Sequence, residues 1–202
     1  MKQKYDVKTI LWTIAGLLIM GFGCGMLVKT GWGADTSNAL FTGIARHTRF
    51  TVGQINMFGT FVFVLLVWIL DKSLIGPAMF LTVLLIRFPV DFAIAVLPAA
   101  ENLFIAVICD LLALYITSIG ASMMIVSGLG CSPYDGLVLA ISNRFHIPFL
   151  YAKYGMDGFC IVSGLLLKGE VGLGTVLCFL LIGLFIDHNR TLMKNVMERI
   201  IK

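Results

Sequence analysis

Residues 120–143, GASMMIVSGLGCSPYDGLVLAISN, predict the fold of this chain more directly than any other stretch. An apolar helix ends there at a Gly-Leu-Gly turn, and a second helix begins directly after it. Ser132 and Pro133 are residue types favoured at a helix N-cap and first turn, and Asp135 places a negative charge near the same helix start. The stretch therefore predicts a helix that is interrupted and restarted within a few residues.

A weaker copy of this pattern lies 97 positions earlier, in residues 23–46, GCGMLVKTGWGADTSNALFTGIAR. The pairs that coincide after this shift are Gly23 with Gly120, Gly31 with Gly128, Gly33 with Gly130, Asn38 with Asp135, Leu40 with Leu137 and Ile44 with Ile141. A shift of 96 positions aligns residues 75–91 with residues 171–187. The sequence therefore predicts two duplicated halves, residues 1–98 and residues 99–202.

The composition excludes an ordinary soluble domain. Of the 202 residues, 59% are apolar and only 13% are charged, and the mean hydropathy is +0.97. This leaves too little polar surface to cover the chain in water. Several apolar runs reach the roughly 20 residues that cross a hydrocarbon core about 30 Å thick, whereas a β-barrel would show short segments of alternating polarity. We therefore expect an all-α, polytopic helical membrane protein with one membrane domain.

About six runs are long enough to be transmembrane helices, three in each half. They cover residues 9–28, 52–70, 74–98, 103–126, 148–167 and 171–186. Two further apolar runs, residues 39–45 and residues 131–143, are short and predict half-helices or re-entrant helices.

The short helices leave two topologies open. If they re-enter, each half crosses an odd number of times and the repeats are inverted; if they cross, the repeats are parallel. Charge favours crossing, because Arg46, Arg49 and Arg144 would then all lie on the cytoplasmic side. A length of about 12 residues argues against a full crossing.

The net charge of +4 is distributed as in a membrane protein. Cations gather at the chain ends and in short connections, with Lys2, Lys4 and Lys8 before the first run and a basic tail after Asp187. Both termini are therefore predicted to be cytoplasmic. The lipid bilayer is the expected partner, and nucleic acid is not.

The sequence contains no motif for a metal, a cofactor or an enzyme. Its five cysteines and three histidines are isolated, without CxxC or Cys/His spacing. No HExxH, GxSxG or Walker-type loop occurs. We therefore expect no metal site, no cofactor and no enzymatic activity.

The two helix restarts are the predicted substrate-binding site. A helix that begins inside or beside the membrane points free N–H groups and the positive end of its dipole at a cavity, and glycine lets a ligand approach the backbone. The candidate residues are Gly31, Gly33, Asn38, Gly128, Gly130, Ser132 and Asp135. The alternative is that the glycines only turn the chain at the membrane surface and that Ser132 only caps a helix.

Charged residues within the spans are candidates for proton or ion coupling, because charge in hydrocarbon is costly. They are Arg87, Asp91, Asp110, Lys153 and Asp157. Arg87 with Asp91 and Lys153 with Asp157 stand four residues apart and can form structural pairs. The face that carries Arg87 should then look into the protein. Asp110 has no partner within its own run and is the best candidate for a proton carrier.

The segments GLGCSPYDGL and GTVLCFLLIGLFID resemble the YczE/YyaS/YitT group of bacterial membrane proteins, over essentially the whole chain. The matching positions are Gly128, Gly130, Ser132, Pro133, Asp135, Gly174, Thr175, Gly183 and Asp187. In the first half, Asp35-Thr36-Ser37-Asn38 replaces the Ser-Pro-x-Asp motif and Arg87 stands at the position of Gly183. The resemblance implies a location in the bacterial cytoplasmic (inner) membrane.

Duplicated halves with interrupted helices at matching positions are typical of secondary transporters. The sequence therefore predicts a small secondary transporter or exporter of an unidentified small-molecule solute. The alternative is a substrate-binding or accessory membrane subunit of a larger transport complex, in which the glycine edge of the first run, around Gly21 and Gly25, would dock a partner. A homo-oligomer is a further open alternative.

Overall fold

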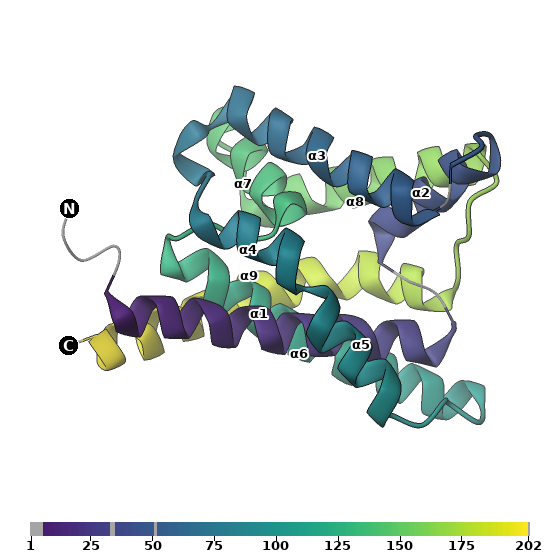
Figure 1. Ribbon diagram of the computed structural model, residues 1–202, viewed down its shortest axis with the longest axis horizontal. Coiled ribbons are helices and arrows are strands. Elements are labelled where there is room, and N and C mark those ends of the chain that lie inside the picture. Colours follow the sequence, from purple (N-terminus) through teal and green to yellow (C-terminus); the bar gives the residue numbers. More distant parts are fainter. Residues whose placement is uncertain (1–5, 33–34, 51, 202) are drawn as a thin grey trace.

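The computed structural model describes residues 6–32, 35–50 and 52–201, and over these residues the regular structure is helical throughout (Figure 1). The helices are α1 (Val7–Thr30), α2 (Thr36–Arg46), α3 (Val52–Leu70), the 3₁₀ turn η1 (Lys72–Leu74), α4 (Pro77–Leu85), α5 (Arg87–Val96), α6 (Leu103–Ser127), α7 (Pro133–Phe145), α8 (Phe149–Leu166) and α9 (Leu173–Ile201). Among the predicted site residues, Gly33 lies outside the described residues.

Four helical segments are long and apolar enough to cross a membrane: α1, α4 with α5, α6 and α9. α3 contributes a shorter apolar stretch, and α8 is 18 residues long but carries two charged residues. α4 and α5 form one kinked span, because Pro89 has no N–H group to bond the carbonyl of Leu85. The prediction of a polytopic helical membrane protein with about six long helices and two short ones is confirmed.

The long helices α1 and α6 pack along small residues. A Cβ atom built on Gly16 would lie 2.9 Å from the carbonyl oxygen of Gly120, and one built on Gly23 would lie 2.8 Å from that of Ala113. Backbones approach this closely only where side chains are small, and in lipid such packing contacts drive helix association.

The remaining glycines of α1 face α5. A Cβ atom on Gly25 would lie 2.6 Å from the carbonyl oxygen of Val90, and one on Gly21 would overlap the ring of Pro89. The glycine edge of α1 is therefore filled from within the chain. It offers no free face to a partner subunit, contrary to the expectation from the sequence.

The short helix α2 enters and leaves the protein at one end. The carbonyl of Trp32, just before α2, accepts a hydrogen bond from the N–H of Gly174 at 2.9 Å. At the other end of α2, Arg46 pairs with Glu170 at 3.3 Å. Because Glu170 and Gly174 both flank the start of α9, the segment returns to the end from which it came, and α2 is a re-entrant half-helix.

The short helix α7 does the same at the opposite end of the molecule. The carbonyl of Leu129 accepts a hydrogen bond from the N–H of Ala78 at 3.1 Å. The side chain of Asn143 donates to Asp71 at 3.0 Å. Asp71 and Ala78 flank the turn between α3 and α4, so α7 re-enters from that side.

The start of α1 and the end of α9 lie together (Figure 1). Lys8 Nζ donates to the carbonyl of Ile200 at 2.9 Å, which joins the start of α1 to the end of α9. Each short helix thus returns to the end of the molecule from which it starts, which agrees with the length argument. α2 and α7 lie toward opposite ends in Figure 1, and Arg46 at the end of α2 has Glu170 beside it.

The helices form two layers in Figure 1. α1, α5, α6 and α9 occupy the lower layer, and α2, α3, α7 and α8 occupy the upper one, with α4 leading from α3 down to α5. Within the upper layer, α2 packs on α8 and α7 packs on α3. Each half-helix is therefore held by a long helix of the other half.

Contacts between the halves come in matching pairs. The Gly174–Trp32 and Ala78–Leu129 hydrogen bonds are related by the offsets of 96 and 97 residues that align the halves in sequence. The Gly16–Gly120 approach is related in the same way to the Gly23–Ala113 approach.

One contact lacks its counterpart. In the second half α8 packs on α9, where the rings of Tyr154 and Phe179 lie 5.6 Å apart. The offsets place Met57 of α3 and Val83 of α4 at the equivalent positions, but the described parts of α3, α4 and α5 show no matching packing. The first half is open where the second half is closed.

Candidate functional site

A cavity of about 520 Å³ lies where the first turns of α2 and α7 meet. Its polar lining comes from both turns, with Asp35 and Asn38 from one and Ser132 and Asp135 from the other, and from Lys153 of α8. Apolar side chains of α1, α3, α6 and α9 complete the wall. The two half-helices, which enter from opposite ends, therefore point their N-termini at one space inside the protein.

Each half-helix starts with a capped first turn. Asp35 accepts hydrogen bonds from the N–H of Asn38 at 2.9 Å and from the Ser37 hydroxyl at 2.7 Å. Ser132 accepts from the N–H of Asp135 at 3.1 Å and donates to the Asp135 carboxylate at 2.7 Å. Both caps satisfy free N–H groups of a helix start, and both bring a carboxylate to the cavity.

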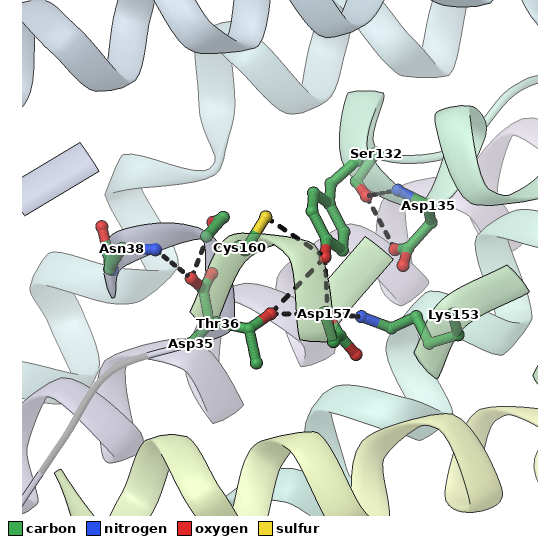
Figure 2. A network of polar contacts seen from close by, with 10 residues as sticks. Asp35, Thr36, Asn38, Ser132, Asp135, Lys153, Asp157 and Cys160 are labelled. Carbon is green, nitrogen blue, oxygen red and sulfur yellow. Dashed lines mark hydrogen bonds and ion pairs between the residues drawn. The ribbon is translucent and has the colours of Figure 1, made fainter. Parts of the chain in front are cut away.

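Asp157 of α8 connects the two first turns. One of its oxygens, Oδ1, accepts from Thr36 of α2 at 2.5 Å, from Tyr134 of α7 at 2.5 Å and from Lys153 at 3.0 Å. Thr36 and Lys153 reach it from opposite sides in Figure 2. Asp157 is fully buried. A single buried carboxylate therefore ties α2, α7 and α8 together at the cavity.

Lys153 and Asp135 keep unused polar atoms in the cavity wall. Lys153 is 4% exposed and makes one hydrogen bond among the described residues, to Asp157, while its ammonium group lies 4.5 Å from the centroid of the Tyr134 ring. Two of its three N–H donors are therefore unpaired. Asp135 is 7% exposed, and only one of its oxygens, Oδ2, bonds a side chain in the described part of the chain.

The equivalent wall in the first half is neutral. The offset of 97 places Asn56 at the position of Lys153 and Thr60 at the position of Asp157, and both residues line the same cavity. Thr60 lies 3.4 Å from the side-chain oxygen of Asn56. At equivalent positions of the cavity wall, the first half therefore has two neutral polar side chains and the second half has an ion pair.

The predicted site residues separate into two groups. Asn38, Ser132 and Asp135 line the cavity, as the sequence predicted, and Lys153 with Asp157 forms its charged wall. The glycines do not line it: Gly31, Gly128 and Gly130 have positive φ angles of 72°, 68° and 108°.

These glycines turn the chain where other residues would be strained. A Cβ atom on Gly31 or Gly128 would meet no atom within 4 Å. A Cβ atom on Gly130 would lie 3.3 Å from the backbone of Gly76, so its missing side chain makes room for the protein itself. The three glycines are therefore explained by turns and close packing of the chain, and their contact with a ligand stays a prediction.

The Arg87–Asp91 pair is exposed, contrary to the prediction that its face looks into the protein. The two side chains are 75% and 66% exposed, and their closest charged atoms are 3.9 Å apart. Val83 and Val90, which share that side of the kinked span, line the cavity. Arg87 itself is not among the lining residues, and its side chain lies on the side that α3 leaves uncovered.

Asp110 is buried but lies away from the cavity. Its Oδ1 accepts from the Thr30 hydroxyl at 2.7 Å between α1 and α6, and its Oδ2 has no partner among the described residues. Asp110 does not line the cavity. A proton carried there would have no direct contact with a ligand in it.

The described residues offer no metal centre. No group of three histidine, cysteine, aspartate or glutamate side chains gathers within them. The cavity instead presents carboxylates, one lysine, amides and hydroxyls, which suit an organic ligand.

A family model described as a family of unknown function (DUF6198) matches residues 7–190. The chain belongs to this family. It is 32% identical over 170 residues to an uncharacterised protein of Haemophilus influenzae, covering 84% of this chain and 78% of the relative. It is 25% identical over 189 residues to the uncharacterised membrane protein YczE of Bacillus subtilis, covering 92% and 86% of the two chains.

A third relative is the uncharacterised protein YyaS of Bacillus subtilis, 22% identical over 177 residues, with 85% and 87% of the two chains covered. No solved structure matches. The resemblance to a YczE-type membrane family is confirmed, and the DUF6198 chain is an integral membrane protein.

The residues of this DUF6198 site that sequence reasoning missed are Thr36, Tyr134, Asn56 and Thr60. A signal existed for Asn56 and Thr60, because the offset of 97 extends through the third helix of each half and pairs them with Lys153 and Asp157. Thr36 and Tyr134 gave no such signal, since their partner is more than twenty residues away in sequence in both cases.

Proposed function

We propose that the chain is a secondary transporter that binds a small solute in the cavity and exposes it to the two sides of the membrane in turn. The observation that carries this proposal is the meeting of two half-helix N-termini, one from each side, at a single polar and apolar cavity. Interrupted helices that point their ends at a site near the bilayer midplane are the arrangement that transporters use to bind solutes.

The matching contacts support an inverted duplication, in which the two halves have the same fold and opposite directions through the membrane. In that case each half can adopt the conformation of the other. The second half is closed at Tyr154 and Phe179, and the first half is open at Met57 and Val83. Exchange of these two states would close the cavity on one side and open it on the other.

The charges support cytoplasmic termini in a bacterial inner membrane. The start of α1, the turn η1, the end of α7 and the second half of α9 hold the described cations Lys8, Lys72, Arg144, Arg190, Lys194 and Arg199, with the acids Asp6, Asp71, Asp187 and Glu198. The end of α1, the end of α2 and the turns before α6 and α9 hold Lys29, Arg46, Arg49 and Lys168, with Glu101 and Glu170. The larger number of lysines and arginines in the first set agrees with the positive-inside tendency, which counts these residues.

The proposal is tested with purified protein in liposomes and no other protein. Vesicles are incubated with a defined mixture of amino acids, amines, organic acids and sugars, and their contents are measured by mass spectrometry. We expect at least one solute to accumulate relative to protein-free vesicles, less so with Asp135→Asn and normally with Glu101→Gln, whose side chain is exposed and away from the cavity. Transport that appears only after a membrane extract is added would instead support an accessory subunit.

A further inference from the structure

The charge of the cavity wall constrains the ligand. Asp35 and Asp135 both line the cavity and each brings a negative charge. The positive charge of Lys153 is offset by Asp157, whose oxygen is 3.0 Å away. Lys153 also attracts Asp135 electrostatically, but its one hydrogen bond among the described residues goes to Asp157. Neither Asp35 nor Asp135 forms an ion pair with a described side chain.

The helix dipoles offset part of this charge. Each helix N-terminus is equivalent to about half a positive elementary charge, and two of them end at the cavity. Two carboxylates against two half-charges leave about one negative charge for a ligand to neutralise. A negative ligand would increase that charge, and a positive one would cancel it.

Unpaired atoms in the wall point to a ligand rather than to a closed polar network. Asp135 is nine-tenths buried, and its Oδ1 has no side-chain partner within the described residues. Asp35, which is exposed, also uses only Oδ1 for its contacts with Ser37 and Asn38. One free oxygen on each first turn is therefore available to accept a hydrogen bond from a cationic group.

Much of the remaining wall is apolar. It includes Met20, Leu27, Phe41, Phe63, Leu114 and Ile182, from five different helices. A ligand of matching chemistry has a hydrocarbon or aromatic body beside its charge.

We propose that the cavity binds an organic cation, an amine with an apolar body, whose positive group lies between the carboxylates of Asp35 and Asp135. This inference rests on the proposed function for its site. It names the class of solute that the site takes. A zwitterion or an anion is the competing class, and Lys153, with two unpaired N–H groups, is where a carboxylate of either would bind.

Three matched compounds separate the classes. Phenethylamine, phenylalanine and 3-phenylpropionate share an aromatic ring and a two-carbon chain and differ in charge. Each is titrated into purified protein while tryptophan fluorescence reports the unfolding temperature. We expect phenethylamine to stabilise the protein and 3-phenylpropionate not to, because only bound ligand stabilises the folded state.

Single substitutions test whether the two carboxylates bind the amine. Asp35→Asn and Asp135→Asn should each weaken phenethylamine binding about tenfold, the loss of one charged hydrogen bond, while Glu101→Gln should bind as the wild type does. Preference for the zwitterion or the anion, equal binding by all variants, or no stabilisation by any of the three compounds would overturn the inference. The liposome experiment is scored separately, so transport of an anion would overturn the solute class and leave the transporter proposal standing.

Discussion

The two halves of the molecule share several contacts and differ in charge. Two hydrogen bonds and two close helix approaches between them are related by offsets of 96 and 97 residues. At the cavity, however, Asn56 and Thr60 of the first half face Lys153 and Asp157 of the second. The comparison teaches that close backbone packing constrains the fold, whereas the cavity wall tolerates different side-chain chemistry in the two halves.

Both half-helices have a carboxylate in or just before their first turn, but at different positions. Asp35 is the N-cap of α2, and its counterpart Ser132 is the N-cap of α7. Asn38 of α2 corresponds to Asp135 of α7. Each half-helix thus brings one carboxylate to the cavity, at the cap in one half and three residues later in the other.

The largest expected difference between the halves concerns Asp157. Asp157→Leu leaves the buried Lys153 charge without its bonded partner, and we expect a loss of about 3–5 kcal/mol in the free energy of unfolding or no folded protein at all. Lys153→Met combined with Asp157→Leu should recover much of this loss. The first-half counterpart, Thr60→Val, should stay within about 0.5 kcal/mol of wild type.

These values are measured by denaturant unfolding in detergent micelles. If the single Asp157→Leu variant is as stable as the double variant, the buried pair does not hold the second half together. The contrast between the halves would then be one of sequence only.

A smaller difference is expected at the second residue of each half-helix. Tyr134→Phe removes one of three hydrogen bonds to Asp157, which should cost about 1.5–3 kcal/mol because the acceptor is charged. Ser37→Ala, at the equivalent position of α2, removes a bond on an accessible turn and should cost about 0.5 kcal/mol or less. Equal losses in the same unfolding assay would show that the two first turns are held alike.

The rim of the open half should tolerate change. Because Arg87 and Asp91 are exposed, Arg87→Gln and Asp91→Asn should each change the free energy of unfolding by less than about 1 kcal/mol. The sequence alone predicted instead that the face carrying Arg87 looks into the protein. A loss above about 3 kcal/mol for either variant would mean that the pair is covered in the folded protein.

The smallest effect is expected where the half-helices end. Hydrogen bonds from Ser73 and Asn143 lower the pKa of Asp71 below its usual range, and this stabilisation is present above the usual pKa and lost as the pH falls through the lowered one. Asn143→Ala should therefore lower the unfolding temperature slightly at pH 7, and by less as the pH falls through the lowered pKa. Arg46→Ala, at the equivalent position of α2, should have a comparably small effect at pH 7, since its pair with Glu170 is exposed.

The features that the sequence predicted correctly depend on residues close together along the chain. The Ser132 cap and the Lys153–Asp157 pair need only neighbours along one helix, and both lie where the sequence places them. The convergence of Thr36 and Tyr134 on Asp157 depends on how α2 and α7 cross α8, which no local pattern encodes.

The error at Arg87 has a similar cause. Its charge predicted burial inside the protein, but whether that side of the kinked span is covered depends on α3, which lies elsewhere in the sequence and leaves it open. The Gly-x-Gly turns likewise indicated that the backbone needs glycine there. They did not indicate which atoms the glycines approach.

The exchange of states between the two halves is tested most directly by distances between spin labels in lipid nanodiscs. One pair of labels is attached to Met57→Cys and Val83→Cys, and a second pair to Tyr154→Cys and Phe179→Cys, with the five native cysteines replaced. The account predicts two distances for each pair, with the short distance for residues 57 and 83 populated to the same extent as the long distance for residues 154 and 179. A single long distance for the first pair and a single short distance for the second, with and without a transported solute, would contradict it.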